Sequence, residues 1–138
     1  MAVVSTPIFP QAINNGTCVL TNTTYQVVFL IGGATNGTRV NFINVVSTDT
    51  SARDVILYIY YVSATYQLTQ VSIPITAGTL NTVPPVNLLT SPQIPNLPRD
   101  PAGNPYILLT SADTIYVSAG TQPTSGKQLT LFAIGENF

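Results

Sequence analysis

Five carboxylates are the residues of this sequence that could carry out acid–base chemistry: Asp49, Asp54, Asp100, Asp113 and Glu136. Two carboxylates held close together can hydrolyse a glycosidic bond or bind a cation. The closest pair in the sequence is Asp49 and Asp54, which flank a short polar segment that also contains Arg53. This pattern is typical of turn capping combined with a surface ion pair. The sequence therefore predicts an exposed hairpin tip at Asp49, Arg53 and Asp54, with a calcium site as the weaker alternative.

Histidine and cysteine, on which many catalytic and metal sites depend, are scarce in this sequence. Histidine, the usual general base of a hydrolytic triad, does not occur in the chain, and Cys18 is its single cysteine. Zinc sites are built from several Cys and His residues, so structural zinc is excluded. We expect no enzymatic activity, no catalytic residue, no cofactor and no metal, and a carboxylate-based hydrolase is the least favoured class of function. Cys18 is expected to be a small buried hydrophobic residue in a strand.

The composition bears on the partners of the chain. Charged residues make up 7% of it, against about 25% in typical soluble domains. Its four basic residues are too few to neutralise the phosphates of a nucleic acid, and its apolar runs are far shorter than the ~20 residues that cross a bilayer as a helix. Isolated monomers usually carry a mixed, charged surface. We therefore expect neither nucleic acid nor membrane as a partner, but a dimer or trimer of the chain or a larger assembly.

Short runs rich in Val, Ile, Thr, Tyr and Phe recur between clusters of Gly, Pro, Asn and Asp, as in a sandwich or barrel. The length of 138 residues fits one domain. The sequence predicts an all-β, single-domain β-sandwich or barrel, and it leaves open whether the strand order is jelly-roll-like or immunoglobulin-like. The predicted strands are residues 17–22, 25–31, 39–47, 55–62, 66–75, 86–89, 106–110, 114–118 and 128–134.

The predicted strand at residues 55–62 is apolar on both faces. Because side chains alternate along a strand, one face carries Val55 and Leu57, and the other carries Tyr58 and Tyr60. A two-layer sandwich covers only one face of each sheet. Tyr offers a large contact area with a polar tip, so Tyr58 and Tyr60 are candidate interface residues.

Two further segments are predicted to reach outward from the domain. Residues 1–16 are expected to form an extended N-terminal arm that docks through Ile8 and Phe9, leaving residues 17–138 as the domain. A Pro-rich loop at about residues 84–105 cannot sustain a sheet ladder, and its prolines at every third position favour a polyproline-II segment. Ile94 and Leu97 on this loop are candidate docking residues. The alternative is that the loop packs on its own domain.

The run of residues 39–55, continued by residues 86–89 and 100–106, resembles small virion proteins of tailed bacteriophages, over about residues 17–138. The resemblance implies a capsid decoration (cement) protein, made in the host cytoplasm and located on the capsid surface of the virion, with the major capsid protein as its partner. A structural component of a phage tail, neck or head fibre is the alternative within the same class. A carbohydrate-binding β-sandwich module, using exposed tyrosines, is the alternative from a different class.

Overall fold

The computed structural model describes residues 12–30, 36–90, 92–110 and 113–138. All nine strands predicted from the sequence are present. Their bounds are β1 (Ala12–Leu20), β2 (Gln26–Leu30), β3 (Thr38–Ser47), β4 (Arg53–Tyr61), β5 (Ala64–Ile73), β6 (Val86–Asn87), β7 (Ile107–Leu109), β8 (Thr114–Ala119) and β9 (Leu129–Asn137). The described part of the chain contains no helix that is long and apolar enough to cross a membrane.

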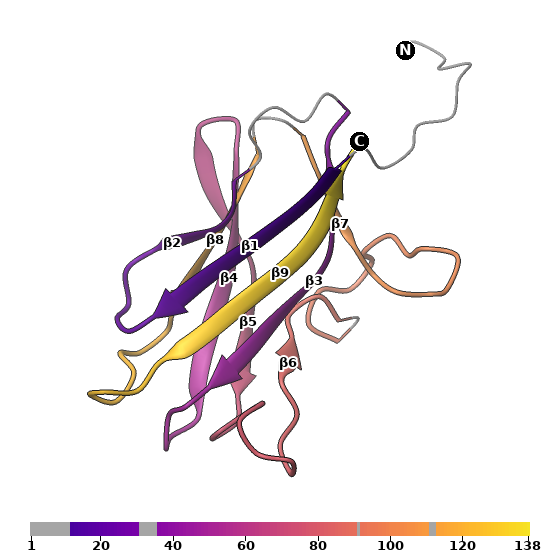
Figure 1. Cartoon of the computed structure of the whole chain (residues 1–138). Helices are drawn as coiled ribbons and strands as arrows, with labels where there is room; N and C mark the ends of the chain where they lie inside the picture. The colour runs from indigo at the N-terminus through magenta and orange to yellow at the C-terminus, as the bar shows by residue number, and fades with distance from the viewer. Residues whose placement is uncertain (1–11, 31–35, 91, 111–112) are drawn as a thin grey trace.

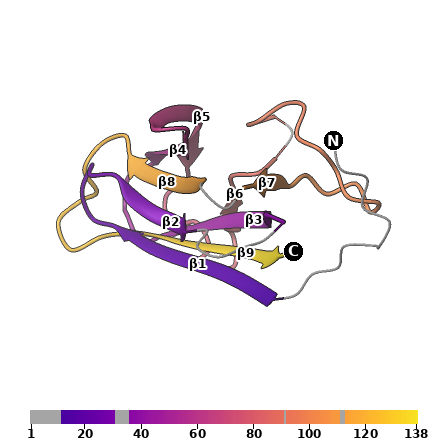
Figure 2. The same cartoon turned by 90° about the horizontal axis from the view of Figure 1, so that it is seen from above.

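The strands form two antiparallel sheets that pack face to face (Figures 1 and 2). Sheet A has the order β1-β9-β3-β6, with β7 also paired to β3, and sheet B has the order β2-β8-β4-β5. With the short strand β7 set aside, the chain changes sheet at every connection except the one between β4 and β5. This order of eight strands is that of a double-sheet jelly roll. The prediction of an all-β sandwich is confirmed, and the immunoglobulin-like and barrel alternatives are excluded.

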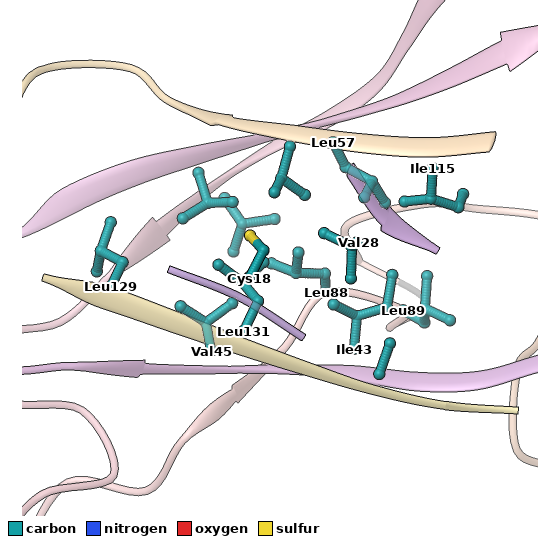
Figure 3. Close-up of a cluster of buried hydrophobic side chains, with 14 of the residues drawn as sticks. Cys18, Val28, Ile43, Val45, Leu57, Leu88, Leu89, Ile115, Leu129 and Leu131 are labelled. Carbon is teal, nitrogen blue, oxygen red and sulfur yellow. The ribbon is translucent and has the colours of Figure 1, made fainter. Parts of the chain in front are cut away.

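Leucine, isoleucine and valine side chains fill the space between the two sheets (Figure 3). Their positions follow the alternation along each strand: on β9, for example, Leu129, Leu131 and Ala133 are fully buried and Phe132 faces outward. The predicted burial of Cys18 is also confirmed, because its side chain points from β1 into this core.

The buried thiol of Cys18 should be poorly reactive. Burial raises its pKa from 9.0 to about 11, and the thiolate is the reactive form. The thiolate fraction at neutral pH is thus about 100-fold lower than in the unfolded chain. We expect a thiol reagent such as Ellman's reagent to label native protein far more slowly than protein in denaturant. Equally fast labelling in both states would contradict the burial.

The predicted hairpin between β3 and β4 is wrong. β3 lies in sheet A, where it pairs with β9, whereas β4 lies in sheet B, where it pairs with β5 and β8. Residues 48–52 therefore form a crossover between the sheets and not a hairpin tip.

The Pro-rich loop packs along the side of the sandwich between β5 and β3. The Leu88 amide donates to the Ile43 carbonyl of sheet A at 2.9 Å, and the Thr69 hydroxyl of sheet B donates to the Gln93 carbonyl at 2.9 Å. The polyproline-II expectation is wrong, since Asn96 has a φ of +69° within a series of turns. The loop thus bridges the two sheets.

The N-terminal arm falls largely outside the described residues. Strand β1 begins at Ala12 and pairs with β9 from there onward, so residues 12–16 of the predicted arm belong to sheet A. Ile8 and Phe9 lie outside the described part of the chain.

Candidate functional site

The outer face of sheet B gathers tyrosines from separate parts of the sequence. Paired residues of neighbouring strands point to the same side of a sheet. Tyr58 of β4 is paired with Tyr116 of β8, and Tyr116 is paired with Val27 of β2. We call this surface the tyrosine face and define it by these residues together with their outward neighbours: Tyr25, Val27, Ile56, Tyr58, Tyr60 and Tyr116.

The rings of the tyrosine face interlock in two pairs. The centroids of Tyr25 and Tyr58 are 4.8 Å apart with an interplanar angle of 73°, and those of Tyr60 and Tyr116 are 6.3 Å apart at 75°. Both pairs are edge-to-face, an arrangement that aromatic rings favour. A hydrogen bond with Tyr58, together with the repulsion between two phenolates, raises the pKa of Tyr25. The carbohydrate-binding alternative is not tested by this geometry and stays a prediction, since Tyr25 and Tyr66 are exposed.

The tyrosine face is apolar and uncharged at its centre. Tyr25 is 57% exposed and Val27 39% exposed. Gln67 and Gln70 of β5 lie in register with Tyr58 and Ile56 on the same side of the sheet. Large aromatic area with few charges is the composition of an interface core. The face therefore has the chemistry of a protein-docking surface.

Asp49 is buried, contrary to the prediction of an exposed tip. Its side chain is 0% exposed, and its carboxylate accepts hydrogen bonds from the Arg53 Nε at 2.9 Å and the Ser51 amide at 3.0 Å. It also accepts from the amide and hydroxyl of Thr124 at 2.9 and 2.8 Å. These donors join the β3–β4 crossover to the β8–β9 connection. Asp54 points elsewhere and accepts from the Gln70 amide at 2.8 Å, so the three predicted residues do not form one site.

The hydrogen bonds around Asp49 keep its carboxylate charged. Burial on its own would raise the pKa of this group, but the donors from Thr124, Ser51 and Arg53 outweigh burial and hold the pKa below its ordinary value. The four hydrogen bonds to its two oxygens give the carboxylate a structural role and do not favour the calcium alternative at this loop. No group of three potential metal ligands of the Asp, Glu, Cys or His type occurs among the described residues.

The remaining carboxylates also have structural partners. Glu136 forms an ion pair with Arg39, whose guanidinium lies 5.6 Å from the ring centroid of Tyr106 and 5.7 Å from that of Phe138. Asp113 accepts a hydrogen bond from the Thr110 amide at 2.9 Å. No two of the five carboxylates hydrogen-bond to each other among the described residues.

A cavity of about 290 Å³ lies where sheet A meets the loop that follows Asp100. The amide of Asn104 donates to the Asp100 carboxylate at 2.9 Å, and this hydrogen bond lowers the pKa of Asp100. The carboxylate thus closes the turn beside the cavity. The lining residues are Asn41, Phe42, Asn87, Asp100, Asn104 and Pro105.

The structure brings together only part of the predicted interface set. Tyr58 and Tyr60 lie on the tyrosine face, whereas Ile94 and Leu97 are half-buried and pack against the core of their own domain. Tyr25 and Tyr116 were missed, although the alternation within residues 114–118 places Tyr116 and Ser118 on one face. Ser118 donates to the Tyr58 hydroxyl at 3.4 Å, which places both side chains on the outer face of sheet B.

The strand order and the core define this protein as a jelly-roll β-sandwich with one additional short strand, β7. No protein-family model matches the chain, and no curated protein matches it. A chain of the solved structure described as the cyanophage Pam1 capsid asymmetric unit is similar to 99% of this chain over 94% of its own length, with 10% sequence identity and a TM-score of 0.48.

Proposed function

We propose that this chain is a non-enzymatic structural protein of a phage virion that binds the outer surface of the capsid as a decoration (cement) protein. The observation that carries the proposal is the uncharged tyrosine face of sheet B. The sequence resemblance of residues 39–55 to small virion proteins supports the viral setting. The major capsid protein is the proposed partner.

The tyrosine face has the composition of a surface that is hydrated in the free protein and buried in a complex. The hydroxyl groups of Tyr25, Tyr58 and Tyr60 can bind water before docking, and the rings supply apolar area after it. Because the rings already pack against each other, little side-chain freedom is lost on binding. A preorganised surface of this kind favours affinity.

The described side chains also support a non-enzymatic role. The carboxylates are the main candidates for acid–base chemistry in a chain without histidine. Asp49, Asp113 and Glu136 each hold a connection or a pair of strands together. A sandwich whose carboxylates have structural roles is suited to linking capsid subunits. A protein that binds the assembled capsid, and not its separate subunits, stabilises the particle by mass action.

A binding assay on capsids that lack this chain tests the proposal. We expect purified protein to sediment with such capsids, and Tyr58→Ala to weaken binding by about 30-fold, as removal of an interface hot spot does. The matched control is Phe132→Ala, which removes an exposed aromatic ring from the outer face of sheet A. Circular dichroism of both variants checks that they fold.

Two results would overturn the proposal. Equally strong binding of the wild type and Tyr58→Ala would show that the tyrosine face is not part of the interface. Absence of capsid binding, with the protein found instead on tails or necks, would replace decoration by a role elsewhere in the virion.

A further inference from the structure

Strand β5 (Ala64–Ile73) is a long strand at one edge of sheet B. It pairs with β4 along its whole length on one side, and no described strand pairs with it on the other (Figure 2). The hydrogen bonds that the described connections make do not use the backbone of residues 64–73 either. The Pro-rich loop reaches β5 only through the Thr69 side chain among these hydrogen bonds, so the outward backbone donors and acceptors of β5 are left to water or to a second extended strand.

This edge lacks the charge and proline by which natural edge strands avoid pairing. Lysines, prolines and inward-pointing charges are the usual protection. The sequence of β5, ATYQLTQVSI, contains no charged residue and no proline. The register between β4 and β5 shifts between Leu57 and Tyr58, where Leu68 is the extra residue of β5, so the pairing proposed below uses the segments on either side of Leu68.

The position of β5 distinguishes it from the other edges. β1 is also long, but it borders sheet A, away from the tyrosine face. β2, the other edge of sheet B, carries Val27 of the tyrosine face but has only five residues. β6 has two residues and β7 three. Of the edge strands in the described part of the chain, β5 alone is both long and continuous with the tyrosine face, through Gln67 opposite Tyr58 and Gln70 opposite Ile56.

We propose that the β5 strands of two copies of this chain pair antiparallel about a two-fold axis. Antiparallel pairing of a strand with itself satisfies two-fold symmetry, the commonest symmetry of homo-oligomers. It joins two four-stranded sheets into one and two tyrosine faces into one continuous surface. The pairing commits the chain to a dimer and excludes a trimer built on this edge.

The side chains of β5 fit a second copy. Like charges directly opposite each other destabilise a strand pair, and an uncharged strand brings none together when it meets itself. The outward residues Thr65, Gln67, Gln70 and Ser72 are exposed, and hydroxyl and amide groups form favourable cross-strand hydrogen bonds. The second copy adds a partner to the proposed function, but the pairing does not depend on capsid binding, so the two proposals can fail separately.

Sedimentation of the full chain, without capsids, tests the pairing. We expect a dimer at tens of micromolar, as an order of magnitude for a modest interface. The double variant Thr65→Lys/Gln67→Lys should be a folded monomer at the same concentration. The control Thr23→Lys/Ser125→Lys adds the same charge at exposed loop positions and should remain dimeric.

Cysteine cross-linking locates the contact. In a Cys18→Ser background, single cysteines are placed at Thr65, Gln67, Gln70 and Ser72, with Thr23→Cys as the control. A residue near a two-fold axis faces its own copy, and a disulfide requires Cα atoms about 4.4–6.8 Å apart. We expect a cross-linked dimer from at least one β5 cysteine and none from the control. A monomeric or trimeric wild type, a dimer that the β5 lysines leave intact, or no β5 cross-link would each overturn the proposal.

Discussion

Replacing Asp49 by alanine is expected to destabilise the protein by about 3 kcal/mol, the lower end of the cost of removing one partner of a buried ion pair. The substitution leaves the Thr124 amide, the Ser51 amide and the Arg53 guanidinium without their acceptor. The lower end applies because the Arg53 side chain is 19% exposed and can recover some hydration. Denaturation with urea, followed by circular dichroism, measures the change in the free energy of unfolding.

The matched control is Asp54→Ala. The Asp54 side chain has one hydrogen-bond donor, the Gln70 amide, in an exposed interaction. Its removal should cost less than about 1 kcal/mol. Similar losses of stability for Asp49→Ala and Asp54→Ala would contradict a special role for the buried Asp49 carboxylate.

The same carboxylate predicts an acid dependence of stability. The folded-state pKa of Asp49 lies below its ordinary value of 3.8, so its contribution is fully present above about pH 4 and is lost as the pH falls through the folded-state pKa. Wild-type stability should therefore fall below pH 4, and Asp49→Asn should lose less stability over the same range. Parallel curves of stability against pH for the wild type and Asp49→Asn would contradict the lowered pKa of Asp49.

Replacing Leu131 by alanine is expected to destabilise the protein by about 2–5 kcal/mol, as for other large-to-small changes in a core. Leu131 is fully buried, and on β9 it lies in register between Cys18 of β1 and Val45 of β3 (Figure 3). Two sheets held apart by their remaining side chains cannot collapse onto the lost volume. Urea denaturation gives the measurement.

Phe132→Ala is the control for this position, because Phe132 follows directly on β9 but faces outward and is 41% exposed. It should cost much less than Leu131→Ala, despite the larger side chain removed. A greater loss of stability from Phe132→Ala than from Leu131→Ala would show that the outer face of sheet A is covered in the free protein.

The sequence was sufficient to predict the strands because their signals are local. Short runs rich in Val, Ile, Thr, Tyr and Phe, interrupted by Gly, Pro, Asn and Asp, located all nine strands. The turn at Val62 and Ser63 was not predicted. Both residues have positive φ, 48° and 64°, as in a two-residue hairpin turn, yet neither is Gly, Asn or Asp, the residues that usually mark such a turn.

The partners of each strand could not be predicted, and the errors at the site follow from this. A polar segment between two apolar strands has the same local pattern in a hairpin and in a crossover, so Asp49 was expected at an exposed tip. Its burial depends on Thr124, 75 positions further along the chain. In the same way, the period of two identified Tyr58 and Tyr60, whereas Tyr25 and Tyr116 join them only through the order of strands in sheet B.

High-resolution imaging of capsids incubated with the purified chain tests the central proposal most directly. We expect ordered additional density at regular positions on the outer shell, into which the jelly roll fits with sheet B and Tyr58 against the major capsid protein. Density at the tail or neck alone, or a molecule bound through sheet A with the tyrosine face open to solvent, would contradict it.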